Sequence, residues 1–496
     1  MATPVQKVVI AGGGTAGWMT AALLRKVLSD KVSIELIESE QIGIVGVGEA
    51  TIPPIQTFNR FLGIDEKAFL RETHGTIKLA IKFENWRVPG ESYYHTFGAP
   101  GTTMGFCSFH HYWLKAQQAN MAQSLWDFDL NYLACEAGKF NKINTQNPLY
   151  DMPYAYHFDS ALYGQFLRKL AEQAGVTRTE GIIEHVQQST EDGFITALQL
   201  QDGKQITGDL FIDCTGLRGL LIRQTLGVNY ADWSHWLPAD SAQAVPSERH
   251  DKTLPYTRSI AHPVGWQWRI PLTHRNGNGI VYSSKYLTDE HATNTLLANL
   301  DTKAIGEPRT IRFETGRTEQ QWCKNVVAIG LSSGFLEPLE STSIHLIQSG
   351  IIRLMKMFPN QGISQAMTDL YNAESQHEFE TIRDFIILHY HVNERDDSDF
   401  WRDMRNMSIP TRLEQKIAAF KDTAAIFNEQ SDIFRDASWV QVMMGQGLFP
   451  ADYHPAADAM DSQALLDAMR QIHHAKHQPL AKLLAHDTFI SQYTSL

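Results

Sequence analysis

Two segments of the sequence carry groups that could do chemistry. In residues 76–86, TIKLAIKFENW, apolar residues alternate with other residues, which predicts a strand with Ile77 and Leu79 on one face and Lys78 and Lys82 on the other. An ammonium group can donate hydrogen bonds to a reacting molecule or act as a nucleophile. A lysine on the second face of a strand is more often solvated, so the pattern alone assigns neither lysine a catalytic role.

The second segment is residues 334–343, GFLEPLESTS, which precedes apolar residues at helical spacing as far as Phe358. Ser341 and Thr342 stand where the N-cap of this predicted helix is expected. The amides of the first helical turn attract anions and would suit a halide ion. Glu340 either takes part in chemistry or simply interacts with the helix dipole.

A pair of tryptophans stands in the segment 265–271, GWQWRIP. Trp266 and Trp268 are two residues apart, so in a strand they project from the same face. They could form a wide apolar wall between a reactive cofactor and the space beyond it. The alternative is that both are core aromatics of an antiparallel strand.

The positioning elements begin at the N-terminus. Residues 7–11 predict a buried parallel strand, followed at once by the glycine loop GGGTAG, a helix over 16–28 and a second strand over 32–37. This unit predicts dinucleotide binding, with a pyrophosphate at the helix N-terminus and the acid after the second strand, Glu38, on a ribose. The loop residues expected to contact the cofactor are Gly12, Gly14, Thr15, Ala16 and Gly17.

Later segments extend this sheet and add a second kind of structure. Residues 209–216 and 325–330 are short apolar strands that end at glycine. Residues 259–272 and 279–284 flank a predicted turn at 274–278 and indicate an antiparallel hairpin. The fold class is therefore mixed α/β, with a Rossmann-type cofactor domain, an antiparallel β-rich substrate module and a mostly helical C-terminal region. We expect a cofactor module over 1–360 with insertions at about 75–150 and 230–310, and a helical region over 361–496.

Composition excludes several classes of function. The net charge of -12 disfavours nucleic acid and anionic membranes as partners, and no run approaches 18 apolar residues. Four scattered cysteines lack zinc-like spacing, and no signal peptide is evident, so we expect free thiols and a cytoplasmic location. The histidine clusters at 110–111, 389–391 and 473–477 are expected to be surface residues, and no metal site is predicted.

Taken together, the motifs resemble those of the flavin-dependent halogenases, the tryptophan halogenase family. The Trp-x-Trp-x-Ile-Pro pattern and the glycine loop carry this resemblance. It extends over segments that look flavin-proximal in the family, namely GVGEATIP at 46–53, YHFD at 156–159 and DCTG at 213–216. The resemblance implies FAD used as FADH2, supplied by a separate NAD(P)H-dependent flavin reductase, and chloride or bromide as co-substrate. It also allows a homodimer.

The resemblance assigns roles to particular residues. It implies that Lys78 is the essential residue on the substrate side, that Glu340 is its partner, and that Thr342 and Ser343 line the halide site. Lys82 then serves as an internal control. Trp266 and Trp268 would separate the flavin from the organic substrate. Further flavin contacts are expected from Gly48, Glu49, Ala50, Gly330 and Leu331.

The substrate is expected to be an indole-like or other electron-rich aromatic. His95 and Phe97 resemble ring-stacking residues of the family's pocket. Members specific for tryptophan hold the amino acid with a tyrosine pair, where this chain has Trp439 and Val440. Burying the two charges of free tryptophan without partners is costly. Many relatives also have glycine where Ser343 stands, which affects the choice between chloride and bromide.

Two alternatives are considered. An aromatic hydroxylase of the single-component FAD type usually has an acidic Gly-Asp motif beside the flavin, whereas this chain has GLSSG at 330–334. A non-catalytic FAD-binding protein would leave Lys78 and Glu340 without a role.

Overall fold

The structure is a computed structural model that describes residues 4–41 and 48–495 of the chain. Gly46 and Val47 of the flavin-proximal motif lie outside these residues. The chain forms two compact units. Unit 1 contains Met1–Gly75, Phe158–Ser241 and Ile311–Glu380, and unit 2 contains Thr76–His157, Ala242–Thr310 and Thr381–Leu496. Mixed sheets and helices confirm the predicted α/β class.

Unit 1 is built on a six-stranded sheet with the order β21-β22-β13-β1-β2-β9. Strand β1 pairs in parallel with β13 and β2, as expected for a nucleotide-binding fold. Val8, Ile10 and Ala11 in β1 are fully buried, which explains why this strand is apolar throughout rather than alternating. The sheet strands are β1 (Lys7–Ala11), β2 (Ser33–Glu38), β9 (Thr177–Glu180), β13 (Leu210–Asp213), β21 (Trp322–Cys323) and β22 (Val326–Ala328).

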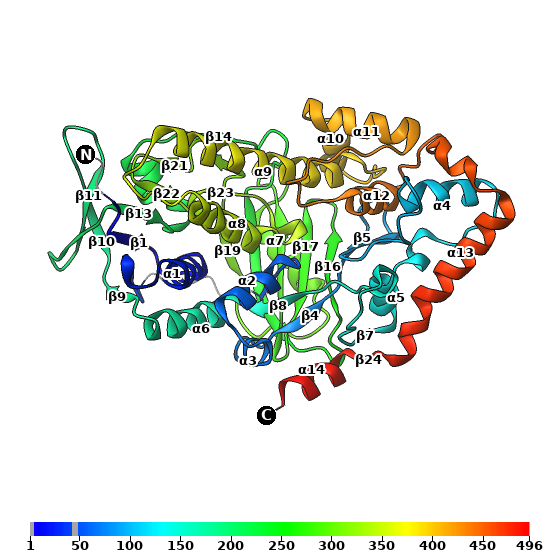
Figure 1. Cartoon of the computed structure of the whole chain (residues 1–496), viewed down its shortest axis with the longest axis horizontal. Coiled ribbons are helices and arrows are strands. Elements are labelled where there is room, and N and C mark those ends of the chain that lie inside the picture. Colours follow the sequence, from blue (N-terminus) through cyan, green and yellow to red (C-terminus); the bar gives the residue numbers. More distant parts are fainter. Residues whose placement is uncertain (1–3, 42–47, 496) are drawn as a thin grey trace. The chain divides into compact units, whose positions relative to one another are not determined.

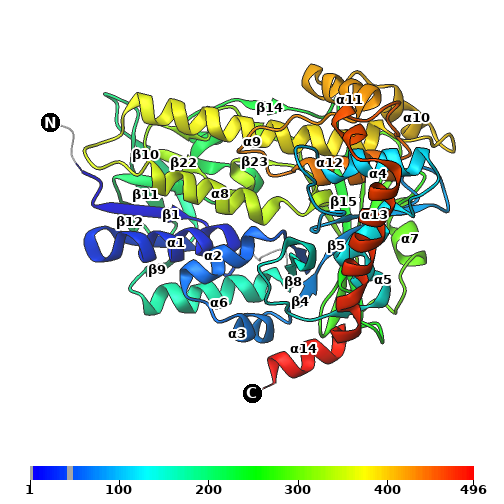
Figure 2. The ribbon, with the colours of Figure 1, turned by 45° about the vertical axis from the view of Figure 1, so that its right-hand side comes forward.

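Helices cover the faces of this sheet. Helix α1 lies between α6 and α8 in both ribbon views (Figure 1 and Figure 2). The helices of unit 1 are α1 (Thr15–Leu28), α2 (Pro54–Leu62), α3 (Glu66–Glu72), α6 (Ser160–Gln173), α8 (Ser343–Lys356) and the N-terminal part of α9 (Gln365–His391). Its other strands are β3 (Gly48–Ala50), β10 (Ile183–Gln188), β11 (Ile195–Leu200), β12 (Gln205–Thr207), β14 (Tyr230–Asp232), β20 (Gly316–Thr318) and β23 (Gly334–Phe335).

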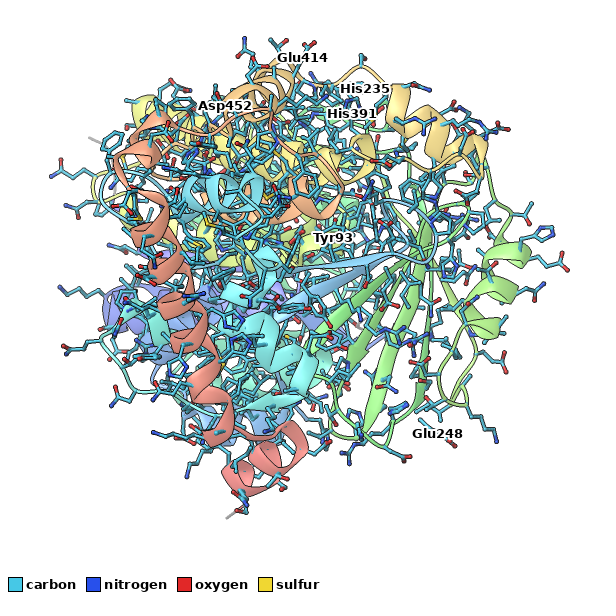
Figure 3. The ribbon with its side chains drawn as sticks, turned by 90° about the vertical axis from the view of Figure 1, so that its right-hand side faces the viewer. Tyr93, His235, Glu248, His391, Glu414 and Asp452 are labelled. Carbon is cyan, nitrogen blue, oxygen red and sulfur yellow. The ribbon has the colours of Figure 1, made fainter. Side chains whose placement is uncertain are left out.

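Unit 2 contains a seven-stranded sheet with the order β19-β15-β18-β17-β16-β5-β6. Strands β16, β17 and β18 are antiparallel, whereas β16 pairs with β5 in parallel. Figure 3 labels Tyr93 on β6, the edge strand of this sheet, where its ring stacks on Phe83 of β5 with centroids 4.9 Å apart. The strands are β5 (Ala80–Glu84), β6 (Ser92–Thr96), β15 (Ser241–Glu248), β16 (Tyr256–Ala261), β17 (Trp266–Pro271), β18 (Arg275–Tyr282) and β19 (Arg309–Arg312).

Most of the C-terminal part of unit 2 is helical, as expected. Strand β4 pairs with residues 155–157 of β8, and β7 pairs with β24. The remaining elements are β4 (Thr76–Lys78), β7 (Lys139–Phe140), β8 (Ala155–Asp159), β24 (Leu484–Ala485), α4 (Phe109–Gln118), α5 (Leu130–Ala137), α7 (Asp289–Ala298), α10 (Asp399–Asn406), α11 (Thr411–Thr423), α12 (Asp436–Gly445), α13 (Ser462–His477) and α14 (His486–Thr494).

The predicted antiparallel hairpin is confirmed by the pairing of β17 with β18, but two details of the predicted strands were wrong. Residues 259–272 form two strands rather than one, because His262 N–H bonds to Gly265 O (3.0 Å) and Gly265 has a φ of 74°. The chain turns there, and the predicted turn residues 275–278 lie inside β18. Residues 76–86 do not form one strand either. The strand breaks at Leu79, so Lys78 lies in β4 and Lys82 in β5.

The units group the segments differently from the expected ranges. The insertions near 75–150 and 230–310 belong to unit 2, together with the chain after Thr381. The boundary expected at residue 361 stays a prediction. Among residues 4–41 and 48–495, no helix has both the length and the apolar composition to cross a membrane.

Candidate active site

The glycine loop of unit 1 is packed tightly on one side and open on the other. A Cβ on Gly12 would lie 2.2 Å from Cys214 O, and one on Gly17 would lie 1.9 Å from Gly12 O, so neither position accepts a side chain. In the part of the chain that the structure describes, a Cβ on Gly14 would meet nothing within 4 Å, and no side chain caps α1 at its N-cap, Gly14. The open amides at this helix start fit the pyrophosphate of a dinucleotide.

Glu38 lies directly over this loop. A Cβ on Gly13 would be 1.7 Å from Glu38 Oε2. That oxygen accepts a hydrogen bond from Trp18 Nε1 (3.1 Å), and Oε1 accepts from Arg178 Nε (2.6 Å) and Arg168 Nη1 (3.3 Å). A carboxylate offers about four lone-pair directions. Among residues 4–41 and 48–495 these are the donors to Glu38, and they leave room for one ribose hydroxyl.

Two other predicted flavin segments border the loop. Gly330 has a φ of 75°, and a Cβ there would lie 2.8 Å from Ala16 Cβ, so the turn after β22 packs against the first turn of α1. Asp213, at the end of β13, is fully buried and accepts hydrogen bonds from Thr215 N (3.0 Å) and Leu221 N (2.8 Å). This carboxylate orders the DCTG turn behind Gly12. The predicted contacts Gly48, Glu49 and Ala50 form β3 of the same unit, and Leu331 is partly exposed.

The predicted halide segment is also in unit 1. A short 3-10 turn ends at Glu340, Ser341 adopts a left-handed φ of 59°, and α8 starts at Ser343 with Thr342 as its N-cap. Glu340 and Thr342 are each only 1% exposed. Within the described residues, Thr342 Oγ1 is buried and makes no hydrogen bond, and no side chain caps the helix. Buried amides beside this hydroxyl could hold a small anion.

Lys78 is in unit 2 and is 0% exposed. Its Nζ lies 5.1 Å from the centroid of the Phe97 ring, and Phe97 N donates to Leu79 O (3.0 Å). Lys82 has a comparable ring contact, with its Nζ 5.3 Å from the Tyr94 ring, but it is only partly buried. Lys78 is therefore not the solvated lysine that the strand pattern alone would favour.

An aromatic cluster in unit 2 connects two of the predicted substrate residues, His95 and Trp439. The His95 ring lies 5.5 Å from Phe385 and 6.1 Å from Phe434. Phe385 stacks on Phe434 (3.9 Å) and contacts Trp439 edge to face (4.9 Å). Sequence reasoning missed Phe385 and Phe434. The apolar pattern of its helix predicts that Phe385 is a core residue, and no local sequence pattern indicates a role for Phe434.

A small hollow borders this cluster within unit 2. Lys416 Nζ lies 4.0 Å from the Trp439 ring and donates to Asn428 Oδ1 (2.6 Å). Burial lowers the pKa of Lys416. The hollow is lined by Thr381, Asp384, Arg412, Leu413, Lys416, Asp432, Phe434 and Trp439.

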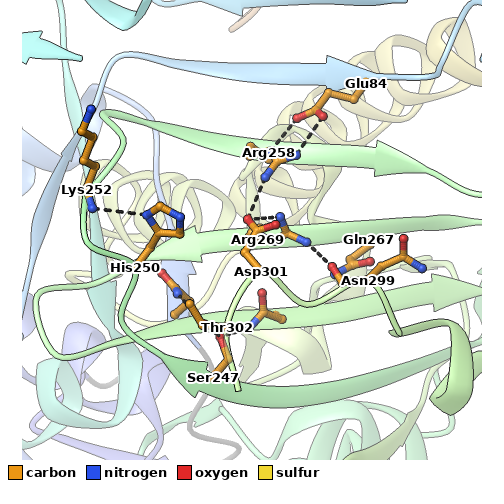
Figure 4. A network of polar contacts seen from close by, with 12 residues as sticks. Glu84, Ser247, His250, Lys252, Arg258, Gln267, Arg269, Asn299, Asp301 and Thr302 are labelled. Carbon is orange, nitrogen blue, oxygen red and sulfur yellow. Dashed lines mark hydrogen bonds and ion pairs between the residues drawn. The ribbon is translucent and has the colours of Figure 1, made fainter. Parts of the chain in front are cut away.

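Trp266 and Trp268 are both buried in unit 2, with ring centroids 6.3 Å apart. The Trp268 ring covers the neighbouring strand at Gly279, where a Cβ would lie 2.1 Å from the indole. The opposite face of β17 carries Arg269, which bonds to Asp301 and to Asn299 O in the polar network of Figure 4. Both indoles therefore lie on the face of β17 opposite Arg269, and the Trp268 indole packs there against Gly279.

The expectation of surface histidines was wrong for three of them. His110, His111 and His389 are buried, because their rings pack in the interior of unit 2. His110 Nε2 lies 3.0 Å from Ala424 O, and His389 Nδ1 lies 2.8 Å from Phe385 O. Within residues 4–41 and 48–495, no group of histidines, cysteines and acids could hold a metal ion.

Buried histidines predict acid sensitivity. Burial lowers the pKa of His110, His157 and His262, and it lowers the pKa of His111 and His486 to about 4. The pKa of a histidine in the unfolded chain is about 6.5. Below that pH the unfolded chain binds protons that the buried histidines do not, so the free energy of unfolding decreases as the pH falls towards 4. For His486 alone, the shift corresponds to about 3 kcal/mol. Urea unfolding at pH 7, 6 and 5 should give a falling free energy of unfolding.

A matched variant isolates one group in this measurement. Burial raises the pKa of Asp129 and Asp213, which opposes the trend at low pH. The test is therefore the difference between the natural protein and His486→Gln, which should show a weaker pH dependence. Identical pH dependence in the two proteins would contradict the role given to this histidine.

The parallel sheet, the uncapped glycine loop and the acid above it define a dinucleotide-binding protein. The family described as Tryptophan halogenase matches residues 7–462 of the chain. Xcc4156, a flavin-dependent halogenase from Xanthomonas campestris, is 47% identical with a TM-score of 0.96, covering 99% of this chain and 98% of that chain. BrvH, a flavin-dependent halogenase from Brevundimonas sp. BAL3, is 43% identical with a TM-score of 0.95, covering 99% of both. The tryptophan 6-halogenase SttH of Streptomyces toxytricini is 36% identical over 491 residues, 92% of each chain. The chain therefore belongs to the tryptophan halogenase family of flavin-dependent halogenases.

This membership confirms the predicted activity and cofactors. The protein is an FADH2-dependent halogenase that uses halide ions and acts on aromatic compounds, with reduced flavin supplied by a separate reductase. The hydroxylase and non-catalytic alternatives are not supported. A homodimer and a cytoplasmic location stay predictions.

Proposed function

We propose that Lys78 and Glu340 deliver hypohalous acid to an indole-like aromatic. When bound, reduced FAD with O2 and halide supplies that oxidant. Lys78 either donates a hydrogen bond to it as an ammonium or, as the neutral amine, takes its halogen to form a haloamine and releases water, and Glu340 helps to orient and polarise it. Both roles come from the family resemblance.

The observation that carries this proposal is the burial of Lys78. Removing an ammonium from water costs several kcal/mol unless its environment compensates. Charged groups kept in such positions are functional candidates, because burial changes their reactivity. The Phe97 ring offers a cation–π contact to this ammonium, and the same ring is a candidate wall for an aromatic substrate.

The flavin is proposed to bind unit 1 along the glycine loop. Gly12, Gly14, Thr15, Ala16 and Gly17 would hold the pyrophosphate, and Glu38 would bind the ribose. Gly48, Glu49, Ala50, Gly330 and Leu331 would contact the rest of the cofactor. The open space over Gly14 and the single remaining acceptor direction on Glu38 support this assignment.

The halide and the barrier complete the proposal. Thr342 and Ser343 would bind chloride or bromide through the start of α8, which the buried Thr342 hydroxyl supports. Trp266 and Trp268 would keep the organic substrate from the flavin. Their burial is equally that of core aromatics, so this role rests on the family pattern.

The substrate is proposed to be an uncharged indole or a similar ring rather than free tryptophan. His95, Phe97 and Trp439 would contact the ring, together with Phe385 and Phe434, which join His95 and Trp439 into one cluster. Relatives are named for action on tryptophan. The family resemblance implies a tyrosine pair in members specific for tryptophan, where this chain has the sequence ASWVQ at 437–441.

The test uses the purified protein with FAD, an added flavin reductase, NADH, and bromide or chloride. We expect halogenated indole by mass spectrometry only when the reductase is present, because one glycine-rich nucleotide loop serves FAD and none remains for a nicotinamide. Rapid reduction of the bound FAD by NADH or NADPH without the reductase would contradict this prediction. Absence of any halogenated product across an aromatic panel would overturn the proposed substrate class.

A further inference from the structure

The buried side chain of His486 bridges the strand that carries Lys78. Ile77 N donates to His486 Nε2 (3.2 Å), and His486 Nδ1 lies 2.9 Å from Thr253 O. An amide can only donate and a carbonyl can only accept. The imidazole must therefore be neutral with its proton on Nδ1, since any other form would lose one of the two bonds.

The imidazole replaces one direct backbone hydrogen bond between the segments that contain Ile77 and Thr253. Leu79 N, two residues beyond Ile77, donates directly to Pro255 O (2.8 Å), two residues beyond Thr253. At Ile77 the same two segments are joined through the ring instead. His486 thus completes the hydrogen bonding of β4 on the edge away from β8, beside Lys78.

A second neutral histidine holds the same strand from β8. Thr76 Oγ1 donates to Pro271 O (2.7 Å), so its single proton is used and it accepts from His157 Nδ1 (2.9 Å). His157 Nε2 then accepts from Thr257 Oγ1 (2.9 Å). Burial and the nearby Lys78 ammonium lower the pKa of His157. Both residues that precede Lys78 are thereby fixed.

The backbone around His486 is anchored without its side chain. Strand β24 pairs with β7, His486 N donates to Gly138 O (3.0 Å), and Phe489 packs edge to face on Phe140 at 4.7 Å. Asp487 Oδ2 accepts from Thr253 N (3.0 Å). Changing the imidazole should therefore leave the C-terminal segment in place and alter mainly the bond to Ile77.

We propose that His486 is a positioning residue for Lys78, through which the last segment of the chain sets the backbone of the catalytic strand. The residue touches neither substrate nor cofactor in this role. This inference rests on the proposed catalytic function of Lys78. His486 acts only through the geometry of β4.

Two variants of His486 separate the two hydrogen bonds. In His486→Asn the side chain can reach Thr253 O but is too short for Ile77 N, whereas in His486→Gln an acceptor returns near the Nε2 position. His474→Asn, at an exposed position of α13, is the control. Lys78→Ala is the reference for complete loss of the transfer step.

The measurements are halogenated product per FADH2 oxidised, free hypohalous acid captured by a trapping nucleophile, and amide exchange in peptides covering residues 76–80. For His486→Asn we expect product per FADH2 to fall at least tenfold, trapped hypohalous acid to rise, and exchange at Ile77 to quicken at least tenfold. His486→Gln should recover most of the product, and the control should match the natural protein.

The outcomes distinguish the two proposals. If Lys78→Ala loses the product while His486→Asn keeps it, the positioning role is wrong and the catalytic role stands. Full activity in Lys78→Ala would overturn the proposed function itself. A loss in His486→Asn that is accompanied by an equal loss of FADH2 oxidation, and that Gln does not rescue, would indicate only structural damage and would also overturn the inference.

Discussion

Replacing Lys78 by alanine should lower halogenation by at least about 100-fold, the scale seen when a charge-stabilising donor is removed from an active site. The variant should still bind FAD and oxidise FADH2, because Lys78 lies in unit 2 and the glycine loop lies in unit 1. Hypohalous acid and hydrogen peroxide should then escape into solution. Product yield, FADH2 consumption and trapped oxidant, measured together, check this expectation.

Lys82 provides a matched control for that experiment. Its Nζ contacts the Tyr94 ring at 5.3 Å, much as that of Lys78 contacts Phe97 at 5.1 Å, but it is only partly buried and lies in β5. Lys82→Ala should change activity by less than about threefold, as expected for a surface substitution. Equal losses in the two variants, or full activity in Lys78→Ala, would rule out the assignment.

Indole should be halogenated about 10- to 100-fold faster than free tryptophan at equal, subsaturating concentrations. Tryptophan brings an ammonium and a carboxylate that need partners when the ring is buried, and each lost partner costs about 1 to 3 kcal/mol. A difference of about 1.4 kcal/mol is a factor of ten. Charged groups near Trp439 already have internal partners, for example Arg412 with Glu429 at 3.1 Å. Competition between the two substrates, analysed by mass spectrometry, gives the ratio directly.

The same competition, repeated in chloride and in bromide, tests the halide site. Bromide is easier to oxidise and to desolvate, so we expect it to be at least as good as chloride where Ser343 replaces the glycine of many relatives. A clear preference for tryptophan would show that the hollow beside Trp439, with Lys416 and Asp384 in its lining, supplies amino-acid contacts. If Ser343 acts at the halide site, Ser343→Gly should change the preference between chloride and bromide and leave the preference between indole and tryptophan unchanged.

The sequence predicted well where the signal is local. The strand β1, the helix α1 and the acid at the end of β2 were all placed within about one residue, because a buried parallel strand, a glycine loop and a helix start each have short patterns. The helix after residue 342 was placed for the same reason. Positions 12 and 17 require glycine because a Cβ there would lie 2.2 Å and 1.9 Å from a backbone oxygen, and the glycine-loop motif reflects this constraint.

Prediction failed where distant contacts decide the outcome. The alternation in residues 76–86 is continuous, yet the strand divides at Leu79 because β4 pairs with β8 and β5 pairs with β6 and β16. His110 and His389 looked like surface residues until neighbours from other segments covered them. Phe434 had no local mark at all, since its importance comes from stacking on Phe385.

By itself the sequence determined the class of cofactor, the family and the residue types available for chemistry, because these depend on motifs whose members are near one another in the chain. Tertiary structure alone decided which of two similar lysines loses all contact with water and which histidines must stay neutral. The physical reason is that burial and hydrogen bonding depend on what the rest of the fold brings to a side chain. His486 illustrates this, because it meets Ile77 from the far end of the chain and fixes the strand that carries Lys78.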